Sequence, residues 1–234
     1  NFSASDDFAG TTRNTTKWGV NDFYKGAGRF TQIDKLVYHT TGTVSGKDWA
    51  AHGWHEQALP YNQDWIFQAD VNLDDFAMPT PKSLMMAGLN VRNQDDPDDT
   101  ALLTLARERE TDGTLIRGFW AEMEVNDNAV VWQASATSST NATVRFRWDA
   151  SEQKLYYEYD ANGATGGFTW TTLTSKALNA GSTNWGMNSS SSFLIALVAE
   201  SENININSIG IWLDNFKIEG STPLAITSNP TSVA

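Results

Sequence analysis

The sequence predicts an all-β protein built as a two-sheet antiparallel β-sandwich, and three observations support this prediction. Apolar and polar residues alternate along several segments, as they do in strands that bury one face. Turn-forming pairs such as Asn162-Gly163 separate these segments. Helical periodicity is weak throughout, and 234 residues suit one large β domain with a substantial core.

The clearest alternation lies in residues 65–73, where every odd position is apolar and the even positions after Ile66 are polar. The same period of two recurs in residues 115–125 and again in residues 144–148. Each pattern is typical of an antiparallel strand with one side in the core and the other facing solvent.

The remaining segments complete the expected sandwich. Residues 154–174 read as a hairpin, and residues 100–109 fit a strand about as well as a helix, so we interpret them as a strand. The apolar run 193–199 suits a central strand covered on both faces, and residues 208–218 close the fold. Residues 40–62 have no clean period and predict a long irregular excursion over the surface.

Composition excludes some classes of binding partner and indicates the compartment of the protein. The net charge of −12 makes nucleic acid and anionic membranes poor partners, and the absence of cysteine excludes thiolate chemistry and cysteine metal sites. No apolar run reaches the length of a membrane helix. Abundant Asn, Thr, Ser and Gly with few Lys indicate a secreted or cell-surface protein.

Both ends of the chain carry acidic-aromatic signatures, Asp6-Asp7-Phe8 and Trp212 to Ile218. With Trp18 and the hairpin from Leu155 to Trp170, they resemble the concanavalin A-like lectin and glucanase superfamily, including laminin-G-like modules. The resemblance covers most of residues 5–220. It implies a jelly roll of two stacked antiparallel sheets, one of them concave, with sugars bound on the concave face or its rim loops.

The resemblance also implies a structural calcium where the terminal strands meet. The matching positions are Asp214 on the last strand with Asp6 or Asp7 near the start. Carboxylate oxygens suit calcium. The alternative is that these three side chains accept hydrogen bonds from turns and strand ends.

One segment suggests catalysis. A period of two places Trp120, Glu122 and Glu124 on one sheet face, and paired carboxylates beside an aromatic platform suit glycoside hydrolysis. The segment resembles the laminarinase-type strand, but Glu124 stands where that motif has Asp, and Asp127 would have to serve as its last acid. The alternative is a solvated polar sheet face.

Two further groups are candidates for sugar contacts. Trp49, His52, Trp54 and His55 lie in the expected loop, where indole faces can stack on pyranose rings and imidazoles can bond hydroxyls. A transition-metal site at these histidines is the less favoured interpretation. Arg145 and Arg147 share a strand face and either contact an anionic sugar or pair with acids such as Glu122 or Glu158.

These observations lead to one functional expectation and two alternatives. We expect a non-catalytic polysaccharide-binding module, monomeric, joined to other modules of the same secreted polypeptide. Residues 1–220 form its sandwich, and residues 221–234 form a linker or the start of a following module. The first alternative is a glycoside hydrolase or polysaccharide lyase of the same fold, and the second is a laminin-G-like adhesion module without a sugar ligand.

Overall fold

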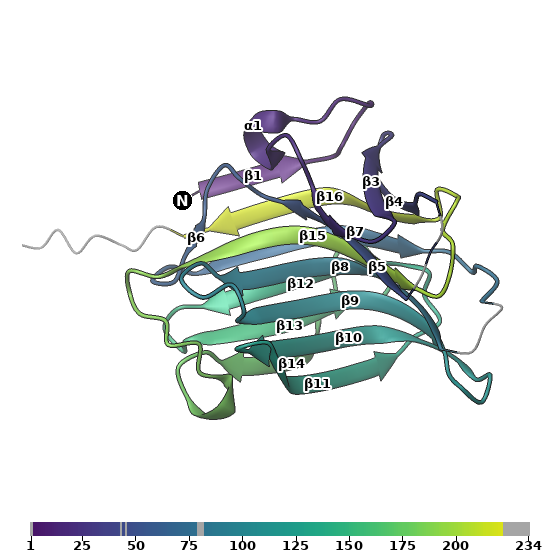
Figure 1. Ribbon diagram of the computed structural model, residues 1–234. Coiled ribbons are helices and arrows are strands. Elements are labelled where there is room, and N and C mark those ends of the chain that lie inside the picture. The colour runs from purple at the N-terminus through teal and green to yellow at the C-terminus, as the bar shows by residue number, and fades with distance from the viewer. Residues whose placement is uncertain (1, 43, 45, 79–81, 222–234) are drawn as a thin grey trace, which may run out of the picture.

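Two eight-stranded antiparallel sheets stack face to face (Figure 1), in a computed structural model that describes residues 2–42, 44, 46–78 and 82–221. The expected all-β, two-sheet antiparallel sandwich is confirmed. The described helical segments are a single turn, α1 (Thr15–Trp18), and a 3-10 turn at Gly181–Thr183. Over the described residues, no helix has the length and apolar character needed to span a membrane.

Sheet A has the strand order β14-β13-β12-β7-β16-β4-β3, with β1 also paired to β16. Its strands are β1 (Phe2–Asp6), β3 (Gly28–Gln32), β4 (Leu36–Thr40), β7 (Trp65–Leu73), β12 (Asn141–Asp149), β13 (Lys154–Asp160), β14 (Thr171–Ala177) and β16 (Ile211–Gly220).

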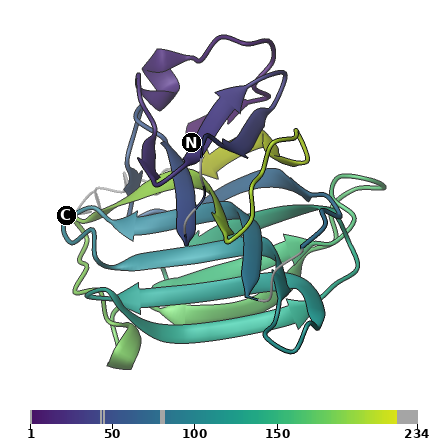
Figure 2. The same ribbon diagram turned by 45° about the vertical axis from the view of Figure 1, so that its right-hand side comes forward.

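Sheet B has the strand order β11-β10-β9-β8-β15-β5-β2, with β6 also paired to β15. Its strands are β2 (Phe23–Lys25), β5 (Lys47–Gly53), β6 (Leu59–Pro60), β8 (Ser83–Asn93), β9 (Thr100–Arg109), β10 (Leu115–Val125), β11 (Asn128–Ala136) and β15 (Ser192–Glu202). Figure 2 shows this sheet from a second direction, with the N-terminal segment above it.

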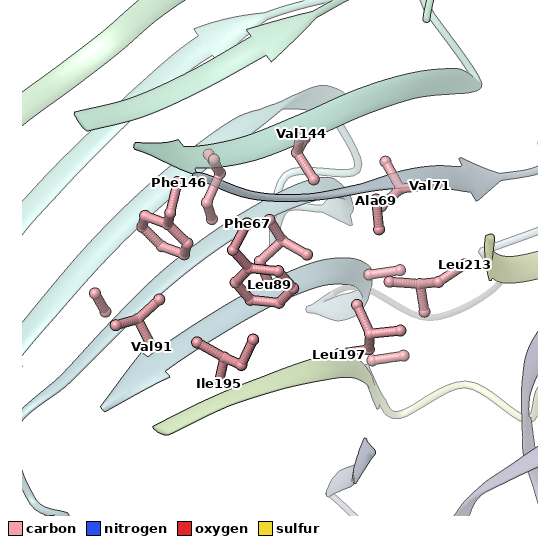
Figure 3. Close-up of a cluster of buried hydrophobic side chains, with 14 of the residues drawn as sticks. Phe67, Ala69, Val71, Leu89, Val91, Val144, Phe146, Ile195, Leu197 and Leu213 are labelled. Carbon is pink, nitrogen blue, oxygen red and sulfur yellow. The ribbon is translucent and has the colours of Figure 1, made fainter. Parts of the chain in front are cut away.

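The core lies between the two sheets. Phe67 and Phe146 of sheet A are fully buried and face Leu89 and Ile195 of sheet B (Figure 3). Alternation along each strand supplies these inward side chains, because successive residues point to opposite faces of a sheet. The residues between these inward positions point outward, and they form the outer face of each sheet.

The two ends of the sandwich meet as expected. Strand β1 pairs antiparallel with β16, so that Asp6 lies opposite Phe216. The strands expected at residues 65–73, 100–109 and 115–125 and the hairpin within 154–174 are all present. The segment expected to follow as a linker lies, beyond Ser221, outside the described residues.

Two expectations about local structure were wrong. Residues 40–62 are not one irregular excursion, because Lys47–Gly53 forms β5, a strand paired with both β15 and β2. The run 193–199 is a central strand, but it is covered on one face only. Its outward residues Leu194, Ala196 and Val198 remain partly exposed, because they lie on the outer face of sheet B.

Candidate functional site

A groove of about 400 Å³ lies on the outer face of sheet B. Strands β5, β8, β9, β10 and β15 line it, together with the connection from β8 to β9 and the turn after β10. The residues that line it are Lys47, Trp49, Ala50, Ala51, Met86, Asn90, Arg92, Pro97, Asp98, Thr100, Leu102, Glu122, Glu124, Asp127, Val198, Ala199 and Glu200.

Strand register explains why these residues share one surface. Asn90 pairs with both Leu102 and Ala196, and Leu102 pairs in turn with Glu122. Cross-strand partners point to the same side of a sheet, so this row runs across the outer face. The row therefore carries a carboxylate at one end and a small apolar residue at the other.

Small residues leave room above the middle of the sheet. Val198 pairs with Gly88 on one side and with Ala51 on the other. Gly88 itself is required by a close approach of strands, because a Cβ there would lie 2.0 Å from the carbonyl oxygen of Leu103. A low floor between taller side chains is the shape that admits an extended ligand.

Three glutamates from two strands surround this floor. Glu122 and Glu124 come from β10, and Glu200 comes from β15. The Glu200 side chain is paired with Lys47 Nζ at 3.0 Å, and Glu124 accepts a long hydrogen bond of 3.4 Å from the Thr100 hydroxyl. For the Glu122 carboxylate, the described part of the chain supplies neither a hydrogen bond nor an ion pair.

Burial shifts the pKa of two of these acids. Desolvation raises the pKa of Glu122, the neighbouring Glu124 carboxylate raises it further, and Lys47 opposes this effect. Desolvation also raises the pKa of Glu200, which is only 6% exposed, against the lowering influence of Lys47. Raised carboxyl pKa values inside a groove are typical of sites that bind or transform a ligand.

Indole rings stand at both sides of the groove. Trp49 lies on β5, where it pairs with Glu200, and lines the groove itself. On the far side, Trp132 of β11 lies directly opposite Glu122 and is 59% exposed. Its ring meets that of Trp120 with centroids 5.0 Å apart at an interplanar angle of 63°.

The structure divides the predicted loop residues between two environments. Trp49 faces the groove and His55 is exposed, but His52 and Trp54 are 1% and 6% exposed and lie in the core. Strand alternation turns His52 inward, where its Nδ1 lies 2.6 Å from the Asp22 carboxylate. A sugar-contacting loop containing all four residues is therefore wrong, because buried rings cannot stack on a ligand.

Arg145 and Arg147 lie on the other side of the molecule, on the outer face of sheet A. Both bond the buried Glu158, through Arg145 Nε at 2.6 Å and Arg147 Nε at 3.3 Å. Their guanidinium groups also cover the rings of Trp170 and Tyr156. Of the two predicted roles, pairing with Glu158 is the one that the geometry bears out.

Each of the three expected calcium ligands accepts a hydrogen bond from the chain itself. Asp6 accepts hydrogen bonds from the Trp18 indole at 2.8 Å and from the Phe8 amide at 2.9 Å, while Asp7 accepts one from the Ala9 amide. Asp214 accepts one from the Asn215 amide, and burial raises its pKa. No group of three or more acidic, histidine or cysteine side chains suited to a metal occurs within the described residues.

Sequence reasoning missed three residues of this site: Glu200, Lys47 and Trp132. The period of two from Leu194 to Glu200 places Glu200 on the outer face, but the apolar run concealed that alternation. Asn126 and Asp127 adopt φ values of 52° and 59°, as a tight hairpin requires, and this turn brings Trp132 opposite Glu122.

A second cavity, of about 580 Å³, lies at the end of sheet A between Phe2, Trp65 and Arg147. Its lining extends to Ser221, the last described residue at that end of the chain.

Comparison with solved structures places the fold. The chain resembles Bacteroides ovatus Xyloglucan PUL GH43B with a TM-score of 0.53 and 14% identity, over 93% of this chain and 38% of that one. It thus spans less than two fifths of that protein. It also resembles the winged bean acidic lectin complexed with methyl-alpha-D-galactose, with a TM-score of 0.58 and 10% identity, over 94% and 99% of the two chains.

A third neighbour is lectin I from Ulex europaeus in complex with the methyl glycoside of alpha-L-fucose, with a TM-score of 0.52 and 12% identity, over 94% of this chain and 98% of the lectin. No family model and no curated protein matches the chain. The neighbours and the two antiparallel sheets agree on a concanavalin A-like jelly-roll fold, as the resemblance predicted.

Proposed function

We propose that this chain is a non-catalytic polysaccharide-binding module, and that its binding site is the groove on the outer face of sheet B. The observation that carries the proposal is the combination of a low floor, the Trp49 indole and hydrogen-bonding groups that project from the same face. Sugar rings offer apolar faces to indoles and hydroxyls to carboxylates and amides. We also propose that the module is monomeric, that it belongs to a secreted multidomain protein, and that it binds a structural calcium ion.

The polar groups of the groove suit hydroxyl recognition. The buried Asn90 amide donates to the Ala101 carbonyl and accepts from Arg92 Nε at 3.0 Å, so it holds the Arg92 guanidinium in the groove lining. The Thr100 hydroxyl donates to Glu124, and the Glu122 carboxylate, which no described residue hydrogen-bonds, lines the same groove. These groups occupy neighbouring strands, so a linear glycan lying across the strands would meet them in succession.

Affinity electrophoresis through gels that contain single soluble polysaccharides tests the proposal. We expect retardation on at least one glycan for the unmodified protein, and a Trp49→Ala variant should lose most of it. A His55→Ala variant serves as the matched control, because its exposed ring lies outside the groove lining. Retardation that survives Trp49→Ala would exclude this site, and no retardation on any glycan would favour an adhesion module.

A second candidate function is glycoside hydrolysis in the same groove. The observation that favours it is that two carboxyl groups with raised pKa values, Glu122 and Glu200, line one groove. Acid and base roles require carboxyl groups held in different environments. Release of reducing ends from the retained polysaccharide, lost in Glu122→Gln and in Glu200→Gln, would establish this function in place of simple binding.

A polysaccharide lyase is less well supported. Such enzymes need basic and phenolic side chains around the substrate, yet the described groove lining includes neither histidine nor tyrosine. Of the three histidines, His52 is buried in the core, and His39 bonds the Thr31 hydroxyl on sheet A. An assay for unsaturated products should therefore remain negative.

A further inference from the structure

The groove holds a charge that the protein itself does not balance. Its lining carries five acidic side chains, Asp98, Glu122, Glu124, Asp127 and Glu200, against two basic ones. Both bases are already engaged, since Lys47 pairs with Glu200 and Arg92 donates to Asn90. An approaching anionic glycan would meet a net negative surface, and a cationic group would be attracted.

Glu122 is the position where this imbalance is sharpest. It is half-buried, the Glu124 carboxylate repels its charge, and Lys47, which is itself paired with Glu200, only partly offsets that repulsion. Among the described residues, no side chain forms a hydrogen bond or an ion pair with it. Placing a carboxylate out of water without a partner costs free energy, so an arriving donor would recover part of that cost. A positively charged donor would recover the most, because hydrogen bonds between charged groups are stronger.

Aromatic rings stand beside this carboxylate. Trp132 lies directly across the strand pair from Glu122, and its exposed ring meets the buried Trp120 ring edge to face on the same side of the sheet. Indole faces attract ammonium groups through their ring electrons. A carboxylate next to the exposed Trp132 indole is thus chemically suited to an amine carried by a sugar ring.

We propose that the groove recognises polysaccharides built from sugars with free amino groups, of the glucosamine type, with Glu122 accepting a hydrogen bond from the ammonium group. This inference rests on the proposed polysaccharide-binding function and specifies its ligand class. Trp132 contacts the same ammonium or the ring that bears it. Uronate-bearing and sulfated glycans are excluded by the surrounding carboxylates.

A matched pair of ligands tests the inference. Titration calorimetry with a glucosamine tetrasaccharide and with its N-acetylated counterpart compares the same backbone with and without the positive charge. At physiological ionic strength and mildly acidic pH, where the sugar amine is protonated, we expect the amine form to bind about tenfold more tightly. Glu122→Gln should remove that preference.

A control variant separates the site from the overall charge of the protein. Glu56 is exposed and outside the groove lining, so Glu56→Gln removes the same charge without touching the site. The inference is overturned if the N-acetylated ligand binds equally well or more tightly, or if Glu56→Gln weakens amine binding as much as Glu122→Gln does. Binding confined to neutral glucans would overturn the inference alone, and binding to no glycan would overturn the proposed function as well.

Discussion

The outer faces of the two sheets differ in how far their charged side chains are paired with one another. On sheet A, Arg145 and Arg147 both bond Glu158, and Lys217 pairs with Glu219 at 2.6 Å. In the groove on sheet B, acids outnumber bases, and Glu122 has no hydrogen-bond or ion-pair partner among the described residues. Around Glu158 and Glu219 the outer face of sheet A satisfies its charges with ion pairs, whereas the groove on sheet B keeps the Glu122 carboxylate available, which is a condition for binding a ligand.

Filling the groove should produce the largest difference between the two faces. Val198→Trp places an indole over the low floor, where the cross-strand neighbours are Gly88 and Ala51. We expect affinity for the retained polysaccharide to fall by about 100-fold, because the bulky ring occupies the ligand's place. Affinity electrophoresis measures this loss.

The matched change on sheet A is Lys217→Trp, at a partly exposed outward position of β16. It should leave retardation unchanged. Equal losses of retardation in the two variants would mean that the groove on sheet B is not the binding site. The difference between the outer faces would then be unrelated to binding.

Breaking the ion pair on sheet A should affect stability and leave binding intact. Arg145→Ala leaves Glu158, which is 4% exposed, with Arg147 as its remaining basic partner. We expect the free energy of unfolding to fall by about 2–3 kcal/mol, because a buried carboxylate loses its best counter-charge. Urea denaturation followed by tryptophan fluorescence measures the change.

The double variant Arg145→Met with Glu158→Leu should regain most of that stability, since it removes both charges together. If Arg145→Ala weakened glycan binding without lowering stability, sheet A would be a binding surface and the contrast between the faces would be reversed.

Removing the exposed indole should have a moderate effect on binding and a small one on stability. Trp132→Ala is expected to weaken polysaccharide affinity about tenfold, as loss of an aromatic contact does at many binding sites. The unfolding free energy should change by no more than about 0.5 kcal/mol, because the ring is largely exposed. Calorimetric titration beside thermal denaturation distinguishes these effects, and a large drop in melting temperature would show that the ring is structural.

The smallest expected effect concerns stability and pH. Burial raises the pKa of Glu122, so the folded protein holds this proton more tightly than the unfolded chain does. The ionised carboxylate therefore lowers stability above its folded pKa, and this cost disappears as the pH falls below the ordinary glutamate value. Glu122→Gln should raise the melting temperature by about 1–3 °C at neutral pH and leave it unchanged in acid.

Differential scanning calorimetry across this pH range, with Glu219→Gln as the control on sheet A, tests the prediction. Glu219 is exposed and paired with Lys217, so its substitution should not raise the melting temperature at any pH. A fall in melting temperature for Glu122→Gln at neutral pH would show that Glu122 already has a stabilising partner.

Local sequence patterns predicted most of the fold and less of the site. Alternation along Trp65–Leu73 and Leu115–Val125 identified strands and placed Trp120, Glu122 and Glu124 on one face, because the pleat ties neighbouring residues to opposite sides. Glu200 escaped notice because its membership of the groove depends on the pairing of β15 with β5 and β8. That pairing joins residues far apart in the sequence.

The central position of β16 has a consequence for how the chain folds during synthesis. This strand connects β7 with β4 and also carries β1, yet it is the last described strand to leave the ribosome. Strand β1 and the β3–β4 hairpin therefore cannot join the rest of their sheet until about 170 residues beyond β4 have been made. Until then, a nascent chain exposes the apolar faces of these strands, and chaperone binding to the first forty residues would protect it from misassembly.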